Sequence, residues 1–433
     1  MKLEGKRAEA IKILSTRGDG KLLTHLNSCV RCGLCADSCI YYIALKEAEF
    51  IPAFKVDMVA SIYRKYCTTI GKIAPGLVNA RELDDAMAMK MVDTLFGGCT
   101  MCGRCVSHCS IGVDIPFVVK KGREMLAAMD MVPKTLQGTV DAALETGNNM
   151  AIPTEEFIET IKWMEEELID ETGDERANIP IDKHGKAIFY TLNPKEPKFF
   201  PLSILAMAKI FYAANEEWTI SSNHYDVTNY GYFSGNDRQA ATIAETLYNE
   251  IHRLGGKRLV MGECGHGSRV NRWEGPNYLE RVYDFDSLTI IELIASYIRE
   301  GRIKLDKSIH KELVTIHDPC NLVRNGGLFG EIRFIVDSAV SNITEMTPCG
   351  SDNFCCGGGG GKLAMSEYNE RRLKIGEIKA DQIRKSGAKI VVTPCHNCVD
   401  QLSQLNHAYN LGIRTVTIAE MVAEALLIEK RVI

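Results

Sequence analysis

The sequence predicts an α plus α/β protein, with a helical amino-terminal region followed by an α/β region that contains an internal duplication. Two cysteine runs of identical spacing, at 29–39 and 99–109, enclose segments with helical periodicity. After residue 185, strand-like apolar runs lead into cysteine loops, and the segments 255–268 and 386–399 share one pattern. A chain of 433 residues is too long for one ordinary core, so we expect more than one domain.

Composition places the chain among soluble globular proteins, with 45% hydrophobic and 25% charged residues. A net charge of −5 and the lack of a long basic run predict no nucleic-acid partner. The segment 1–14 has no apolar run, so no signal peptide is expected. The most apolar stretch, 199–214, is shorter than a spanning helix and carries Pro201 and Lys209. It predicts a core helix; the alternative is a helix that docks on a membrane-embedded partner.

Sixteen cysteines in a chain without a leader indicate a reducing compartment and metal or redox chemistry. Residues 29–39 read CVRCGLCADSC and residues 99–109 read CTMCGRCVSHC. Each is a C-x2-C-x2-C-x3-C run. In such a run three cysteines hold one cluster and the fourth reaches the other. We therefore assign one [4Fe–4S] cubane to Cys29, Cys32, Cys35 and Cys109, and a second to Cys99, Cys102, Cys105 and Cys39.

Zinc is the alternative, but zinc sites pair two short cysteine hairpins across a longer gap. The proline that usually follows the fourth cysteine is replaced by Ile40 and Ser110, which leaves the ligands intact. Between the motifs, 56–67 and 81–96 have helical periodicity, so the region 1–130 resembles the α-helical ferredoxin domain. Cys67 lies in this insert and is expected to be a buried thiol that binds no metal. An acidic helical connector is expected over 131–184.

The α/β region ends in three cysteine loops. They contain Cys320, the adjacent pair Cys355 and Cys356, and the pair Cys395 and Cys398. Each follows a strand-like run or a turn, and ligands of open α/β sheets bind at the carboxyl ends of strands. Adjacent cysteines close a disulfide only with strain, and the five glycines that follow let the backbone approach a cluster. A phosphate loop is the alternative, but Lys362 is followed by Leu363 where Ser or Thr is required.

These five cysteines resemble the CCG motif of heterodisulfide-reductase-type proteins. The resemblance implies that Cys320, Cys355, Cys356, Cys395 and Cys398 hold a noncubane [4Fe–4S] cluster. It also implies a pseudo-duplicated, Rossmann-like CCG domain, with a degenerate first half over 185–300 and a cluster-binding half over 301–433. The layout is similar to that of heterodisulfide reductase D and its relatives in membrane complexes of sulfate reducers.

The first half keeps little of the motif. Tyr and Phe stand where the cysteine pair is expected, and Cys264 is the single cysteine between 185 and 300. The segment 262–266, GECGH, resembles a signature in subunits attached to dissimilatory sulfite reductase and to multihaem cytochromes. Cys264, His266 and Arg269 are therefore candidate catalytic residues, with Cys264 facing the noncubane cluster. Plain structural roles are the alternative for all three.

Four further side chains flank the cluster ligands in sequence and are candidates for hydrogen bonds that tune the potential: His317, Arg324, Lys362 and His396. The chain has no G-x-G-x-x-G fingerprint, so no flavin or nucleotide is expected.

The resemblance implies an iron–sulfur oxidoreductase subunit of a respiratory redox complex in anaerobic metabolism. Single electrons would pass through two cubanes to the noncubane site, where a protein or small-molecule disulfide is reduced. The alternatives are a non-catalytic electron relay and a structural or sensing subunit. Expected partners are a b-type cytochrome or quinone-binding membrane subunit, a multihaem cytochrome c and other iron–sulfur subunits. The chain would lie peripherally on the cytoplasmic side of the membrane.

Overall fold

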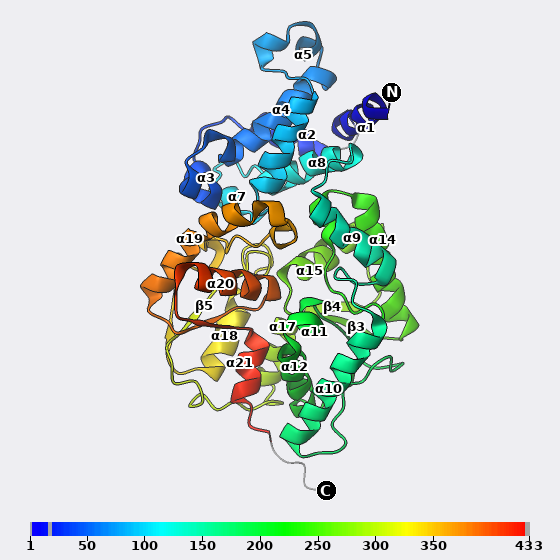
Figure 1. Ribbon diagram of the computed structural model, residues 1–433, viewed down its shortest axis with the longest axis vertical. Helices are drawn as coiled ribbons and strands as arrows, with labels where there is room; N and C mark the ends of the chain where they lie inside the picture. Colours follow the sequence, from blue (N-terminus) through cyan, green and yellow to red (C-terminus); the bar gives the residue numbers. More distant parts are fainter. Residues whose placement is uncertain (1, 16–19, 429–433) are drawn as a thin grey trace. The chain divides into compact units, whose positions relative to one another are not determined.

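The computed structural model describes residues 2–15 and 20–428, which form two compact units (Figure 1). Unit 1 runs as far as Gly138 and adds two later segments, Tyr230–Gln239 and Phe354–Lys379. Unit 2 consists of Thr139–Asn229, Ala240–Asn353 and the chain from Ala380 onward. Each unit is therefore built from three stretches of sequence.

Unit 1 is helical. Its helices are α1 (Lys2–Ser15), α2 (Gly20–Ser28), α3 (Ile40–Leu45), α4 (Pro52–Cys67), α5 (Thr69–Ile73), α6 (Asp85–Met91), α7 (Arg104–Ser107), α8 (Ile115–Ala128) and α13 (Tyr230–Ser234). Three more helices contribute residues to both units: α9 (Lys134–Thr146), α14 (Asp237–Arg253) and α19 (Asn369–Ser386).

Helix α8 is the centre of unit 1 and packs against α1 and α4 (Figure 1). Asp114 caps its start by accepting a hydrogen bond from the Phe117 N–H at 3.1 Å, and Pro116 stands in the first turn, where its missing N–H costs nothing. Gly122 lets a neighbouring segment approach closely, because a Cβ there would lie 2.4 Å from Leu95 Cδ1. Helix α8 thus supplies part of the core of unit 1, with Val118, Met125 and Leu126 buried.

The helical periodicity of the insert between the cysteine runs is confirmed. The segment 56–67 lies in α4, and 81–96 contains α6, which continues into a π-helical turn at Val92–Gly97. Cys67, the last residue of α4, is partly exposed; the expectation that it would be buried was wrong. A helix terminus seldom has core on all sides, which periodicity alone does not reveal.

Unit 2 contains two parallel sheets of four strands each, as the α/β prediction requires. The first has the order β2-β1-β3-β4 and the second has the order β6-β5-β7-β8. The strands are β1 (Ile188–Thr191), β2 (Trp218–Ile220), β3 (Arg258–Met261), β4 (Asp286–Thr289), β5 (Val314–Ile316), β6 (Ile343–Thr344), β7 (Ile390–Val392) and β8 (Arg414–Val416). In register, Phe189 of β1 pairs with Leu259 of β3, and Thr315 of β5 pairs with Val391 of β7.

The helices of unit 2 connect and cover these strands. They are α10 (Thr154–Thr172), α11 (Lys195–Phe199), α12 (Pro201–Ala213), α15 (Gly265–Arg269), α16 (Gly275–Tyr278), α17 (Ile290–Arg299), α18 (Phe329–Ala339), α20 (His396–Tyr409) and α21 (Ile418–Ala425). The segment 131–184, which is predicted to be an acidic helical connector, contains α10. This helix buries Phe157, Ile161, Met164 and Leu168 in the core of unit 2.

The two sheets have the same strand order, which is the arrangement that an internal duplication would produce. The correspondence extends to helix capping. Thr289 and Glu292 form a capping box at the start of α17, after β4, and Thr417 and Glu420 form another at the start of α21, after β8. The same residue types therefore begin the equivalent helix in each half.

The apolar stretch 199–214 forms a core helix, as expected. It contains α12, which packs against α10 and α21 in unit 2 (Figure 1) and buries Ile204, Leu205, Met207 and Phe211. Within the described residues, no helix is both long and apolar enough to cross a membrane.

Candidate metal centres

The first cysteine motif and the last cysteine of the second motif meet around one cavity in unit 1. Its lining includes the thiols assigned to the first cubane: Cys29, Cys32, Cys35 and Cys109. Burial raises the pKa of Cys35, and the neighbouring Cys29 and Cys109 thiols raise it further. The Val113 N–H donates to Cys109 Sγ at 3.4 Å. Four converging thiols and a backbone donor fit the needs of a thiolate-ligated cluster.

The remaining thiols of the two motifs also gather in unit 1. Burial raises the pKa of Cys105 well above its ordinary value, and Cys102, Cys39 and Cys99 add to this effect in that order. Cys39 stands just before α3, and the Met101 N–H donates to Cys99 Sγ at 3.3 Å. Cys39 therefore lies with the second motif, although it belongs to the first in sequence. Electrostatic coupling among these four thiols fits a second thiolate-bound cluster.

The glycine-rich segment that follows Cys355 and Cys356 packs against the second motif within unit 1. A Cβ on Gly360, whose φ is +66°, would lie 2.8 Å from the carbonyl carbon of Thr100. Gly357, at φ 102°, donates its N–H to Cys355 Sγ at 3.4 Å. The run of glycines is therefore explained by a left-handed backbone and by close contact with the loop that carries Cys99.

In unit 2, the cysteine loops stand at the carboxyl ends of parallel strands. Cys320 follows β5, while Cys395 and Cys398 begin α20 after β7. Cys264, after β3, begins α15 in the same manner as Cys395 begins α20. The Gly265 N–H donates to Cys395 Sγ at 3.4 Å, so the Cys264 and Cys395 loops face each other. The shared strand order brings them together.

Cys264 is fully buried and held by two donors. The Gly267 N–H lies 3.3 Å and Asn193 Nδ2 lies 3.5 Å from Cys264 Sγ. Burial raises the pKa of this thiol, and Cys395 raises it further. By contrast, the hydrogen bond from Cys398 lowers the pKa of Cys395. Cys395 therefore gives up its proton more readily than Cys264, as a metal ligand must.

The two histidines beside these cysteines have polar partners of their own. His266 Nδ1 lies 2.8 Å from Asn397 Nδ2, and burial lowers the pKa of His266 to about 3, so Nδ1 accepts from the amide. His396 Nε2 lies 3.4 Å from Glu196 Oε1, and burial lowers the pKa of His396 to about 3. Both rings are therefore neutral. Arg269, at the end of α15, is partly exposed.

The other three flanking residues have different neighbours: His317 lies near a cysteine sulfur, whereas Arg324 and Lys362 bind backbone carbonyls. A ring nitrogen of His317 and Cys398 Sγ lie within 4.8 Å of each other. Arg324 instead donates to the Ser351 carbonyl at 2.6 Å and to the Asn353 carbonyl, which fixes the loop before Cys355. Lys362 Nζ donates to the Phe96 carbonyl inside unit 1.

Several polar residues near the cysteines were not anticipated from the sequence. Asp318, two positions before Cys320, accepts from Arg333 Nη2 at 3.0 Å and from the Gly350 N–H at 2.6 Å. Asp318 could have been found, since it stands inside HDPC. Tyr41, Lys55 and Arg123, all buried in unit 1, carry no pattern that distinguishes them from surface residues.

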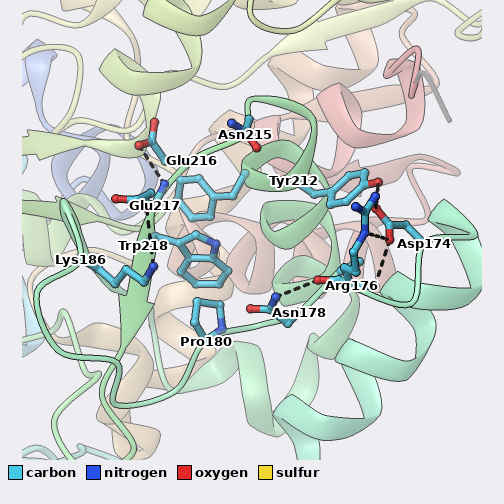
Figure 2. A pocket seen from close by; sticks show the side chains of 12 residues that line it. Asp174, Arg176, Asn178, Pro180, Lys186, Tyr212, Asn215, Glu216, Glu217 and Trp218 are labelled. Carbon is cyan, nitrogen blue, oxygen red and sulfur yellow. Dashed lines mark hydrogen bonds and ion pairs between the residues drawn. The ribbon is translucent and has the colours of Figure 1, made fainter. Parts of the chain in front are cut away.

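A cavity of about 330 Å³ in unit 2 has no cysteine among its lining residues (Figure 2). Trp218, Lys186 and Glu217 line it at the amino-terminal ends of β1 and β2, with a Lys186–Glu217 ion pair at 3.8 Å. On its other side, Asp174 accepts from Arg176 Nε and from Tyr212 Oη, each at 2.9 Å. Ligands of α/β sheets bind at the opposite strand ends, so we assign this cavity no role.

Comparison with known proteins agrees with both cysteine arrangements. Residues 25–113 match the family model described as the 4Fe-4S dicluster domain, and residues 314–403 match the cysteine-rich domain called CCG. The chain is therefore an iron–sulfur protein that joins these two domains.

Three relatives match most of this chain. The chain is 29% identical to Hdr-like menaquinol oxidoreductase iron-sulfur subunit 2 of Archaeoglobus fulgidus, over 93% of this chain and 80% of the relative. It is 24% identical to dihydromethanophenazine:CoB–CoM heterodisulfide reductase D of Methanosarcina barkeri, over 93% and 95%. It is 23% identical to EtfAB:quinone oxidoreductase of Syntrophomonas wolfei, over 88% and 55%.

The chain is accordingly similar, over most of its length, to iron–sulfur subunits of the heterodisulfide reductase D type, and the resemblance inferred from its cysteine motifs is confirmed. None of the three names refers to sulfate reduction, so that expectation stays a prediction.

Proposed function

We propose that this chain is the electron-transferring iron–sulfur subunit of a membrane-associated respiratory complex and that it reduces a disulfide or related sulfur substrate. Two cubanes, held by the four-cysteine sets described above, would carry single electrons, and a noncubane cluster would be the site of sulfur chemistry. The ligands of that third cluster would be Cys320, Cys355, Cys356, Cys395 and Cys398.

One observation carries the proposal: within unit 1 the glycine-rich segment of the CCG motif packs on the second ferredoxin-type loop. The Gly359 and Gly360 positions contact the Thr100 backbone, next to Cys99. Burial first, then Cys99, Cys355 and Cys39 raise the pKa of Tyr41, so this one phenol lies close to thiols of both motifs. A short path between the second cubane and the third cluster is what stepwise electron delivery to a sulfur substrate requires.

The chain's own residues would prepare the third site by fixing its thiolates. Backbone N–H groups of Gly357 and Gly265 donate to Cys355 and Cys395, which favours the ionised sulfurs that iron binds. Arg324 and Asp318 both hold the loop that precedes Cys355, through Ser351 and Gly350. Cys264, His266 and Arg269 remain candidates for contact with the substrate.

The partner is expected at the first cubane. Val30, Leu34 and Ile111 line the cavity of this motif, with exposed fractions of 71%, 61% and 51%. Such an apolar rim around a redox site supports docking of a redox partner. By similarity to the menaquinol and heterodisulfide oxidoreductases, we propose a quinone-binding or b-type cytochrome membrane subunit, with a multihaem cytochrome c beyond it, and a peripheral position on the cytoplasmic side.

A pure electron relay is the second candidate. It is favoured by the first half of the duplication, which retains only Cys264 of the cluster-binding cysteines. In that case the third cluster would pass electrons to another iron–sulfur subunit without binding a sulfur compound.

The test combines metal content with EPR on the anaerobically purified full chain. We expect about twelve irons in the wild-type protein and about eight in Cys356→Ser, because the variant removes one ligand of the third cluster only. Cys67→Ser is the matched control and should retain about twelve. Bound zinc, or about eight irons in the wild type, would refute the three-cluster assignment.

Addition of thiol and disulfide compounds then separates the two functions. A paramagnetic signal that depends on the compound and is lost in Cys356→Ser is the result expected of the reductase. If twelve irons are present and no such signal arises at any potential, the relay is the correct function.

A further inference from the structure

Among the buried basic side chains of unit 1, three that are each at most 1% exposed lie around the second cysteine motif: Lys55, Arg123 and Lys362. Within residues 2–15 and 20–428, none of them forms an ion pair with a carboxylate. A buried charge without a counter-charge is strongly unfavourable, so these cations call for a nearby anion. A cluster with thiolate ligands is such an anion.

Lys55 and Lys362 flank one aromatic ring. Lys55 Nζ lies 5.6 Å and Lys362 Nζ lies 5.7 Å from the centre of the Tyr41 ring. Each side-chain nitrogen also donates to a backbone carbonyl, of Phe50 at 3.2 Å for Lys55 and of Phe96 for Lys362. Burial lowers the pKa of Lys362 well below its ordinary value, and the Cys99 thiol is the strongest influence that opposes this fall, so an anionic cluster at Cys99 would favour the charged lysine. Burial raises the pKa of Cys39, and Lys55 is the strongest influence that opposes this rise. Lys55 therefore acts directly on a ligand of the second cubane.

Arg123 is anchored entirely by carbonyl groups. Its guanidinium donates to Leu95 at 3.1 Å, Cys99 at 3.0 Å, Phe233 at 2.7 Å and Gly360 at 2.9 Å. Burial lowers the pKa of Arg123 to about 10, so it remains charged at neutral pH. Its positive charge therefore lies next to the backbone of the loop that carries Cys99.

Tyr41 adds a hydrogen-bond donor without an acceptor. Its side chain is 1% exposed, and its hydroxyl has no hydrogen-bond partner among the described residues. The thiols that act on this hydroxyl are those of Cys99, Cys355 and Cys39. An orphaned O–H beside thiolate ligands fits a cluster sulfur as its acceptor.

The first motif lacks these features. Its cavity is walled by apolar side chains such as Val113 and Ile115, and Arg31 is the cation at its edge. Arg31 is half exposed and pairs with Asp57 at 2.5 Å, so solvent and a carboxylate both reduce its influence. The two cubane sites therefore differ in electrostatics, although their cysteine spacings are identical.

We propose that Lys55, Lys362, Arg123 and Tyr41 give the cluster of the second motif a higher reduction potential than that of the first. This inference rests on the cubane ligand sets of the proposed function. Reduction adds a negative charge, which uncompensated cations and a sulfur-directed O–H stabilise. Burial alone would oppose the reduction of the cluster. The same low-dielectric surroundings, however, leave the attraction between the cations and the cluster unscreened. One electron thus passes from the first site, which is oxidised, to the second, which is reduced; no bond changes.

An EPR-monitored redox titration of the full chain tests this. Lys55→Met and Lys362→Met remove one amino group each with little change in length. Each should lower the midpoint potential of one cubane by about 59 mV or more, a tenfold shift in its reduced-to-oxidised ratio, and leave the other unchanged. Tyr41→Phe should shift the same signal in the same direction. In the wild type, the EPR signal that these variants shift should be the first of the two cubane signals to appear on reduction.

Two controls separate the possible failures. Lys90→Met removes a lysine that is 43% exposed and pairs with Glu49, so it should shift neither signal. Tyr42→Phe alters the neighbouring phenol, which packs with Lys46 instead. If iron content shows both cubanes but the three buried variants leave the potentials unchanged, this inference is refuted and the proposed function stands. If the wild type lacks two cubane signals, the ligand assignment itself fails.

Discussion

Glu196 and His396 are two buried polar side chains that lie side by side near the cysteine loops of unit 2. Glu196 is 1% exposed, accepts from the Asn193 N–H at 2.8 Å and faces His396. Burial raises the pKa of Glu196 to about 8. Candidate cysteine ligands follow from spacing along the sequence, whereas the direction of each neighbouring histidine does not, because it depends on partners from other elements. His396 beside Glu196 shows this.

The raised pKa of Glu196 predicts a pH-dependent stability. Between its ordinary value of 4.5 and about 8, the folded chain keeps a proton that the unfolded chain releases. The free energy of unfolding should therefore fall as pH rises through this window, by about 1.4 kcal/mol per pH unit from this group. Denaturant unfolding at pH 5 to 8 should show a smaller fall for Glu196→Gln. The exposed Glu217→Gln should behave as wild type; equal slopes in all three would contradict the effect.

At the scale of elements, the backbone conformation of the glycine-rich segment fits its close contacts with the Thr100 loop and with Arg123. Gly360 has a left-handed backbone, and its carbonyl accepts from Arg123 at 2.9 Å. The sequence predicted that the glycines allow a close backbone approach. It could not identify the neighbour, since a contact with the Thr100 loop spans some 260 residues, and no local pattern records such a partner.

Gly360→Ala should disturb the second motif specifically. A Cβ would lie 2.8–2.9 Å from Thr100 backbone atoms, and a non-glycine residue with positive φ carries a further cost of about 1–3 kcal/mol. We expect an altered EPR signal or loss of iron at the second cubane, with the first cubane intact. Gly76→Ala, where a Cβ meets nothing within 4 Å, should leave both signals unchanged. Unaltered signals in Gly360→Ala would show that the loop yields without consequence.

At the scale of the whole molecule, the regions around the first and second sheets each supply one segment to unit 1, Tyr230–Gln239 and Phe354–Lys379. The similar patterns of 255–268 and 386–399 predicted repeated halves, and the two sheets have the same strand order, as a duplication would produce. Patterns along the chain assign sequence neighbours to one domain, however, so they cannot show that two later segments complete the unit formed by the residues up to Gly138. The sequence motifs therefore identify the cysteines that are expected to bind the cubanes. They do not identify all the segments that form the unit around those cysteines.

This organisation predicts what the amino-terminal part can do alone. A fragment of residues 1–138 retains all eight cubane cysteines, but Arg123 would lose the Phe233 and Gly360 carbonyls that accept two of its hydrogen bonds. Each unsatisfied buried donor costs about 1–3 kcal/mol, and more for a charged group. The same truncation removes Lys362. The fragment should therefore bind a stable first cubane, while its second cubane is lost or has a lowered potential. Iron content and EPR after anaerobic reconstitution measure both. Eight irons with the potentials of the intact chain would mean that the inserted segments are dispensable for the second site.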